Sequence, residues 1–288
     1  MPTTYAHWRF GDKCIDTLDN NLKNIITNNR EIFDFGVHGP DIFFYYNCLK
    51  HNEINQFGTN LHDIPFKDTL SKIKPLYQKC DNKDAALSYL LGFVCHFTLD
   101  SYCHGYIDLK DETCGIPHGK IESQLDRYFL KKDGYNPVKK SVTFSLKPSK
   151  EIAHVIYQLF PEINEKDVYK TLKDQLFYLN LLKDDSDIKR WILNKAMDLA
   201  HAYSFKELLI TKEDDPRCLD TNERLNKLFN IAVKHYPILA NNLVDYLNDK
   251  CELDAYYHNH FCPKEDYKQI PILSYEDELK YSINEFQK

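Results

Sequence analysis

Apolar residues recur at helical spacing along most of the chain. Between residues 12 and 29, Ile15, Leu18, Leu22 and Ile26 follow one another at intervals of three and four, which places their side chains on one face of an α-helix. Helices are predicted over residues 12–29, 41–50, 66–79, 84–104, 117–132, 149–160, 165–183, 186–210, 221–249 and 275–287. The pattern therefore predicts an all-α protein built as a multi-helix bundle in a single domain.

One short segment follows the pattern of a β-strand instead. Ser141–Leu146 alternates polar and apolar residues, as a strand with one buried face does. Further along, the acidic turn at residues 212–216 is the candidate boundary between two parts of the chain, although no low-complexity linker marks it. We therefore expect residues 1–212 to form the main helical domain and residues 213–288 to form a helical extension packed on the same domain.

The composition is that of a folded globular protein. Apolar residues make up 43% and charged residues 28% of the 288 residues, which is ordinary globular usage. Only 9 Gly and 12 Pro are present, too few for the many turns of a β-sandwich or barrel. The net charge of -6 has the wrong sign for attraction to phosphate backbones, so no stable nucleic-acid partner is expected.

The cysteines and the apolar stretches indicate the cellular compartment and whether the chain crosses a membrane. Nine cysteines are scattered without a spaced disulfide framework, and the N-terminal residues carry no secretory signal pattern. A reducing cytoplasm is therefore expected. The most apolar stretch, Ala85–Phe97, is interrupted by polar residues and is shorter than the about 20 residues of a bilayer span, so no integral membrane segment is predicted. The oligomeric state stays open.

The predicted helix over residues 84–104 carries three metal-ligating residue types on one stripe. His96, Asp100 and His104 are spaced by four, so each lies one helical turn from the next. Asp100 can share an ion with either neighbour, since a carboxylate can bridge two metal ions. The alternative is a helix whose core histidines are satisfied by hydrogen bonds. Burial of three such groups on one stripe is costly without a partner, which favours metal binding.

Other candidate ligands lie before and after this helix. His118 and Glu122 are spaced by four after Pro117, where proline suits the first turn of a helix. Asp41 follows Gly-Pro at the predicted start of a helix, a position that also suits ordinary capping. His62 is expected in a loop, with His51 as the alternative ligand. His7 is a further candidate ligand, and Asp126, on the same face as His118 and Glu122, could orient a ligand without binding the metal itself. The remaining histidines considered, which show no ligand spacing, are His154, His201, His235, His258 and His260.

Together these motifs resemble those of the zinc-dependent phospholipase C family, which shares its fold with the fungal tri-zinc nucleases. The shared pieces are an N-terminal His-Trp, a Gly-Pro-Asp turn, a Gly-x-x-x-His-x-x-x-Asp helix with a following His, and a His-x-x-x-Glu helix. They occur in the family's order between Tyr5 and Asp126. The resemblance implies an all-helical domain with zinc ions in an internal cleft, and the signal-less members carry the most similar helix motif.

The resemblance also implies a ligand set. One zinc would take Asp41, His62, His96 and Asp100, and a second would take His104, His118 and Glu122. A third would take His7 and Asp100 together with an N-terminal Trp freed by signal cleavage in secreted members. Here Trp8 follows His7 and no processing signal precedes it. Two zinc ions are therefore expected, and the third is left open. The spacing from Asp100 to His104 is also shorter than in the secreted enzymes.

The activity that the resemblance implies is hydrolysis of a phospholipid head-group ester by a metal-bound hydroxide. Asp41 is the expected general base. The aromatic residues 43–46 either line the mouth of the cleft or pack in the core. Two alternatives stay open: a nuclease or nucleotidase on the same metal frame, and a non-catalytic helical zinc protein. Catalytic zinc sites keep one coordination position open, whereas structural sites do not.

Overall fold

A computed structural model describes residues 4–183, 186–199, 206–262 and 270–283 of the chain. Over these residues the secondary structure is α-helix and short 3-10 helix, with no strand. The prediction of an all-α fold is confirmed. No described helix combines the length and the apolar character needed to cross a membrane.

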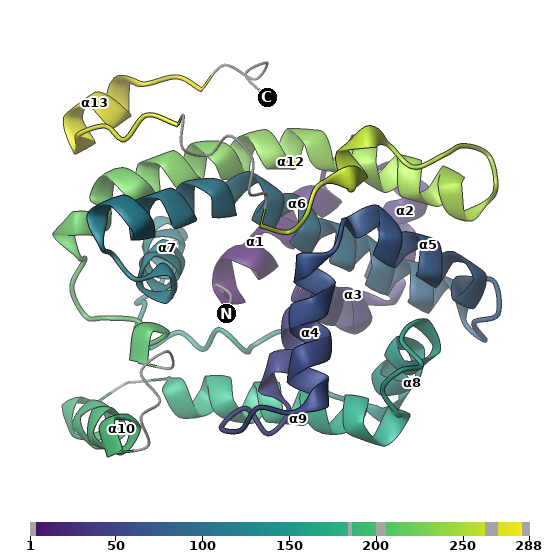
Figure 1. Cartoon of the computed structure of the whole chain (residues 1–288), viewed down its shortest axis with the longest axis horizontal. Helices are drawn as coiled ribbons and strands as arrows, with labels where there is room; N and C mark the ends of the chain where they lie inside the picture. Colours follow the sequence, from purple (N-terminus) through teal and green to yellow (C-terminus); the bar gives the residue numbers. More distant parts are fainter. Residues whose placement is uncertain (1–3, 184–185, 200–205, 263–269, 284–288) are drawn as a thin grey trace.

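The helices follow one another with short connections (Figure 1). In chain order they are α1 (Thr4–Ile15), α2 (Asn20–Asn28), α3 (Arg30–Gly36), η1 (Gly39–Tyr45), α4 (Glu53–Asp63), α5 (Phe66–Tyr77), α6 (Lys83–Cys114), α7 (His118–Lys132), α8 (Lys150–Leu159), α9 (Glu165–Leu182), α10 (Asp187–Leu199), η2 (Pro216–Cys218), α12 (Leu219–Leu247), η3 (Ala255–His258) and α13 (Tyr275–Lys280). The elements labelled η are 3-10 helices.

Helix α6 is the central element of the molecule. It is 32 residues long and is buried on nearly every side from Ala85 to Lys110, as expected of a helix that is apolar on most sides. The Asn82 side chain accepts a hydrogen bond from the Ala85 amide at its start, and Gly115 ends it at φ 62°, a left-handed conformation that favours glycine. Helix α12 runs alongside α6 (Figure 1), and the Tyr236 hydroxyl donates to the Leu91 carbonyl at 3.1 Å.

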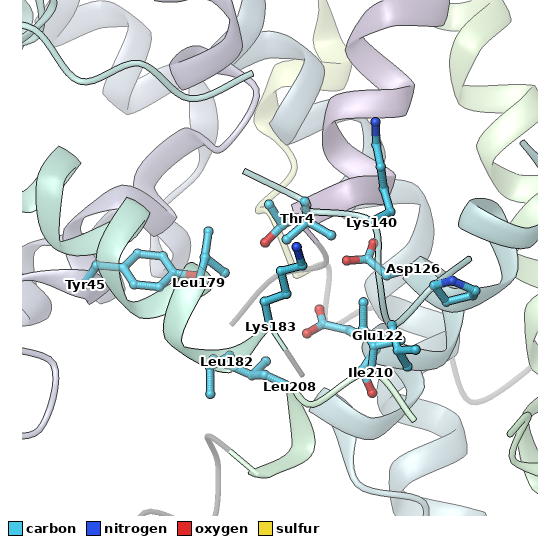
Figure 2. Close-up of a pocket in the computed structure, with 14 residues that line it drawn as sticks. Thr4, Tyr45, Glu122, Asp126, Lys140, Leu179, Leu182, Lys183, Leu208 and Ile210 are labelled. Carbon is cyan, nitrogen blue, oxygen red and sulfur yellow. The ribbon is translucent and has the colours of Figure 1, made fainter. Parts of the chain in front are cut away.

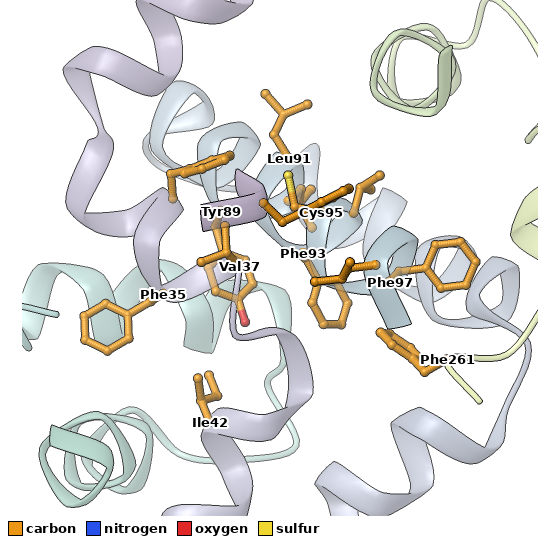
Figure 3. Close-up of a cluster of buried hydrophobic side chains, with 14 of the residues drawn as sticks. Phe35, Val37, Ile42, Tyr89, Leu91, Phe93, Cys95, Phe97 and Phe261 are labelled. Carbon is orange, nitrogen blue, oxygen red and sulfur yellow. The ribbon is translucent and has the colours of Figure 1, made fainter. Parts of the chain in front are cut away.

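Helix α3 lies unusually close to α6. A Cβ atom on Gly92 would come within 2.6 Å of the Phe33 carbonyl oxygen, so only glycine permits this approach of the two backbones. The contact brings the end of α3 next to the turn of α6 that carries His96. Around it, apolar side chains including Val37, Phe93 and Phe97 form the core of the molecule (Figure 3).

The predicted strand at Ser141–Leu146 is wrong. The segment consists of turns, and its polar side chains bond locally: the Ser141 and Thr143 hydroxyls lie 2.8 Å apart, and Thr143 donates to Asn180 at 2.8 Å. Since no strand exists among the described residues to pair with it, alternation of polar and apolar residues was not sufficient evidence for a strand.

Several predicted helices have different bounds in the structure. The segment 12–29 is interrupted, because the Asp19 carboxylate accepts hydrogen bonds from two amides and starts α2 anew. The segment 41–50 is the 3-10 helix η1, which ends at Tyr45. Helices α1, α3 and α4 were missed over most of their length. Helix α10 ends at Leu199 within the described part, and His201 lies outside the described residues.

Candidate metal centre

Histidine and carboxylate side chains from five helical elements meet inside the molecule. They belong to α1, η1, α4, α6 and α7 and form three groups whose ligand atoms lie within 4.8 Å of one another: His7, His96 and Asp100; Asp41, His62 and His96; and His104, His118 and Glu122. Six of these side chains are buried, and His62 and His118 are partly exposed. The stripe on α6 thus supplies at least one member of each group.

Asp100 joins α6 to the N-terminal helix. Its Oδ1 lies 3.1 Å from His7 Nε2, and its Oδ2 lies 3.0 Å from His96 Nε2. The His7 and His96 rings are stacked with their centroids 4.3 Å apart. The two oxygens of one carboxylate therefore face two different histidines, which is the arrangement that a bridging carboxylate requires.

Asp41 makes the same kind of contact on the other side of His96. Its Oδ1 lies 3.1 Å from His62 Nε2 and its Oδ2 lies 3.3 Å from His96 Nε2. Pro40 at the start of η1 sets the backbone there. His96 thus belongs to two groups at once, and these groups are adjacent.

Glu122 contacts the remaining two histidines of the site, His104 and His118. Its Oε1 lies 3.4 Å from His104 Nε2 and 3.2 Å from His118 Nε2. His118 and Glu122 lie one turn apart on α7, which begins at the predicted position after Pro117. This group is linked to the others through α6, where His104 Nδ1 lies 3.8 Å from Asp100 Oδ2.

Hydrogen bonds on the far side of the rings orient the histidines. The Nδ1 atom of His96 lies 3.2 Å from the Val37 carbonyl oxygen, and that of His62 lies 2.8 Å from the Gly58 carbonyl oxygen. A carbonyl oxygen can only accept, so Nδ1 carries the hydrogen and Nε2 of the neutral ring is left with its lone pair. Such outer contacts are typical of metal-ligating histidines.

The eight side chains fit a metal cluster better than a hydrogen-bonded core. The Nε2 atoms of His62, His96, His104 and His118 face carboxylate oxygens at 3.0 to 3.4 Å while their Nδ1 atoms lie near acceptor oxygens. Two lone pairs that face each other repel unless a proton or a cation lies between them. Four buried ligand-type atoms have no hydrogen-bond partner: His7 Nδ1, Asp41 Oδ2, His96 Nε2 and Glu122 Oε2. Zinc ligands in proteins are of this type, imidazole nitrogen and carboxylate oxygen.

The pKa values of the site residues in the metal-free protein also indicate that the carboxylates need positive charge beside them. Burial alone would raise the pKa of Asp100, but the neighbouring histidines hold it well below its usual value. Burial alone would lower the pKa of His118, but Glu122 and Asp108 raise it to about 9. Without a metal ion, protons would therefore have to supply the positive charge that the carboxylates demand.

Asp126 binds the start of α1, the helix that carries His7. Its carboxylate oxygens accept hydrogen bonds from the backbone amides of Tyr5 at 3.0 Å and Ala6 at 2.7 Å, which are the first amides of α1 and lie directly before His7. Carboxylates at a helix start also interact favourably with the helix dipole. Burial raises the pKa of Asp126 to about 7 despite these two donors. Asp126 thus fixes the helix that carries His7.

All eight predicted ligand positions are brought together, but two expectations about their surroundings need correction. His62 lies on α4 and not in a loop. His51 is exposed and belongs to none of the groups found among the described residues, and neither do His258 and His260. The structure places His96, as well as Asp100, in the group that contains His7.

Sequence reasoning missed several residues around the centre. His38 is buried and both of its ring nitrogens lack partners; burial, followed by the nearby His7 and His96, lowers its pKa to about 3. The only indication of His38 in the sequence was its position three residues before Asp41. Asp108 gave no signal, although its Oδ1 lies 3.0 Å from His118 Nδ1. Phe261 and Cys262 contact His104 and directly follow His258 and His260, which sequence reasoning set aside.

A pocket opens beside this centre. Figure 2 shows the Glu122 and Asp126 carboxylates on its lining, together with the side chain of Lys183. Apolar residues complete the wall: Tyr45, Val142, Leu179, Leu182, Leu208 and Ile210. The pocket therefore joins a charged end at Glu122 to an apolar wall.

Comparison with known proteins agrees with this site. A family model described as zinc dependent phospholipase C matches residues 6–202, a span that contains every side chain of the three groups. No curated protein and no solved structure matches the chain significantly. The family supports zinc binding and a hydrolase activity of the phosphodiesterase kind. The chain belongs to the zinc-dependent phospholipase C family.

Proposed function

We propose that the protein is a zinc-dependent phosphodiesterase that hydrolyses the head-group ester of a phospholipid, as a phospholipase C does. The observation that carries the proposal is the position of Asp100: its Oδ2 lies 3.0 Å from His96 Nε2 and 3.8 Å from His104 Nδ1, so it lies between the two ligand groups. Adjacent groups would hold metal ions close together, and adjacent ions are a recurring solution for the cleavage of phosphoric esters.

The proposed assignment uses two ions. Asp41, His62, His96 and Asp100 would hold the first, and His104, His118 and Glu122 would hold the second. His7 would orient Asp100 through the 3.1 Å contact of its Nε2 and would be the ligand of any third ion. When bound, zinc supplies a Lewis acid that neutralises phosphoryl charge and makes a nearby water more acidic.

The protein side chains then have defined tasks. We assign the role of proton acceptor to Asp41, because its Oδ2 is buried and receives no hydrogen bond. Burial alone would raise the pKa of Asp41, but His96 and His62 lower it below the usual value, so the carboxylate is ionised at neutral pH. An ionised oxygen without a donor can accept the proton of an attacking water.

The pocket supports a lipid as the substrate. Its wall of Leu179, Leu182 and Leu208 is apolar, and Lys183 on the same wall offers a positive charge to the phosphate. A nucleotide would require polar contacts to a base, and the pocket wall beside Glu122 is mostly apolar.

The test is metal content and hydrolysis of a nitrophenyl phosphorylcholine by purified protein. The Asp100→Asn variant should lose metal and at least about 100-fold in activity, because the neutral amide is a poor ligand and cannot bridge. The matched control is Asp68→Asn, the same chemical change at an exposed position on α5, which should leave both quantities unchanged. Full zinc content with unchanged activity in Asp100→Asn would contradict the proposal.

A further inference from the structure

Helix α10 carries apolar side chains on two faces. The inner face is buried, because Leu193 and Met197 pack with Leu182 of α9 and with Leu209 in a small apolar cluster apart from the main core. This packing sets the rotation of α10 about its own axis. The opposite face of the helix is therefore turned to solvent in a fixed direction.

The outer face of α10 is mostly apolar as well. Counted from Ile188, its residues lie three, four, seven and eleven positions further on, which places them on one stripe of a helix: Ile188, Trp191, Ile192, Lys195 and Leu199. The four apolar side chains of this set are exposed by 54% to 85%, whereas the two on the inner face are exposed by 9% each. We call these five residues the outer stripe of α10.

Exposed apolar side chains are concentrated in this part of the molecule. Among the described residues, six of the large exposed ones lie between positions 177 and 199: the four of the outer stripe, and Phe177 and Leu181 on the preceding helix α9. Figure 1 shows α10 at an edge of the molecule, at the lower left. Gathered apolar surface of this kind marks a site of interaction with a protein or a membrane.

The outer stripe lies close to the pocket beside the metal centre. Leu182 and Leu208 line that pocket and also belong to the small cluster that holds the inner face of α10. The cluster thus forms the pocket wall on one side and supports α10 on the other. The outer stripe is separated from this wall by the helix itself, a thickness of about 10 to 12 Å.

The chemistry of the outer stripe fits a lipid surface. Tryptophan and aliphatic residues are the side chains that interfacial helices insert below the head groups. Lys195 is the one charged residue of the stripe, and a lysine can keep its ammonium group at the lipid phosphates while its methylene groups lie deeper. Asp187 and Asp198 flank the stripe, and each is paired with a lysine, Lys212 and Lys206 respectively.

A second copy of the chain fits the outer stripe less well. A standard protein–protein interface involves about 20 to 30 residues a side, and the stripe offers four apolar side chains on a single helix. Insertion among lipids needs no matching partner surface. The small area and the position beside the pocket therefore favour a membrane.

We propose that the outer stripe of α10 binds the surface of a phospholipid membrane, with Trp191 and Ile192 inserted among the lipids, and so brings the pocket to its substrate. The inference rests on the proposed function, which takes a phospholipid as the substrate. None of the five residues of the stripe lines the pocket, so the stripe binds the membrane without taking part in hydrolysis.

The test measures sedimentation with vesicles of phosphatidylcholine and phosphatidylglycerol. Ile192→Asp should weaken vesicle binding at least about 10-fold, because a carboxylate opposes insertion into lipid. The matched control is Ile238→Asp on α12, where the isoleucine is exposed by 57% and that of α10 by 54%; this variant should bind as the wild type does. Both variants should keep the zinc content and the hydrolysis of the soluble nitrophenyl phosphorylcholine.

Tryptophan fluorescence locates the inserted side chain. The chain has two tryptophans, Trp8 and Trp191. On addition of vesicles, the emission of the wild type should shift to shorter wavelength, and Trp191→Phe should still bind but show no such shift. Binding of the wild type without the shift would overturn the inference.

Three other results would also overturn it: a wild type that hydrolyses the soluble ester but does not bind vesicles, an Ile192→Asp that binds as the wild type does, and an Ile238→Asp that loses as much binding. So would wild-type dimers that Ile192→Asp dissociates, since a second copy would then cover the stripe. Failure of the proposed function looks different. Vesicle binding through the stripe by a protein that cleaves neither soluble nor lipid ester would support the surface and contradict the enzyme.

Discussion

At the scale of single residues, the atoms left without partners define the site. Asp41 Oδ2, His96 Nε2 and Glu122 Oε2 are buried in a protein interior and receive no hydrogen bond. An unsatisfied buried polar atom costs about 1 to 3 kcal/mol, so several of them in one place need an explanation. Bound cations provide one, because each of these three atoms is a potential metal ligand.

Glu122→Gln is predicted to affect one group only. The amide keeps an oxygen near His104 and His118 but loses the charge, so the affinity for the second ion should fall about 10- to 100-fold. Binding at Asp41, His62 and His96 should be unchanged. Zinc titration with a competing chelator measures the two affinities separately. Glu53→Gln, on an exposed residue of α4, is the control, and equal weakening of both ions in Glu122→Gln would argue against two separate groups.

The double variant His258→Ala/His260→Ala is predicted to keep wild-type zinc content and activity. Neither side chain belongs to a ligand group among the described residues, although both lie close in sequence to Phe261 and Cys262, which contact His104. Elemental analysis and the phosphorylcholine assay check this. A large loss of zinc would mean that the site includes residues that we have excluded.

At the scale of helices, the close approach of α3 to α6 holds the Val37 carbonyl against His96. Gly92 permits it, since a side chain there would meet the Phe33 carbonyl. The geometry of the metal centre therefore depends on a glycine that lies one turn away from the nearest ligand.

Gly92→Ala is accordingly predicted to destabilise the protein and to loosen the site. Overpacking of this kind costs about 1 to 3 kcal/mol, which should appear as a lower midpoint in urea unfolding. Zinc affinity should fall in parallel because Val37 moves away from His96. The matched change is Gly134→Ala at a turn where no atom lies within 4 Å; it should lower stability through its positive φ without changing zinc affinity.

The elements also show what the sequence could and could not reveal. The ligand stripe on α6 and the pair on α7 were predictable, because the spacing of four residues is a local property of a helix. The helical position of His62 was missed although Ile54, Phe57 and Leu61 of α4 are spaced by three and four; the other residues of this short helix are mostly polar. The strand at 141–146 failed because alternation says nothing about whether a partner strand exists.

At the scale of the whole molecule, contacts between distant segments complete the centre. Asp126 on α7 fixes the start of α1, and Phe261 reaches His104 across 157 positions of the chain. No local pattern predicts such contacts, because they depend on how the helices pack. We propose that residues 213–288 are packed on residues 1–212 as one domain, since α12 lies along α6 and the Phe261 carbonyl lies against His104.

Removal of the metal is predicted to lower the stability of the entire protein. A ligand present at about 1,000 times its Kd stabilises the folded state by about 4 kcal/mol, so a chelator should lower the unfolding midpoint by about 10 °C. Calorimetry with and without chelator measures the difference, and re-addition of zinc should restore it. An unchanged midpoint in protein that has verifiably lost its zinc would argue that the ions do not connect the helices.

The central claim is that histidine and carboxylate side chains from α1, η1, α4, α6 and α7 share a cluster of zinc ions. Elemental analysis of freshly purified protein tests it most directly. The account predicts two tightly held zinc ions per chain, or three if His7 also holds one, and the loss of at least one of them in Asp100→Asn but not in Asp68→Asn. A wild-type protein without stoichiometric zinc, which also fails to take it up on addition, would contradict the account.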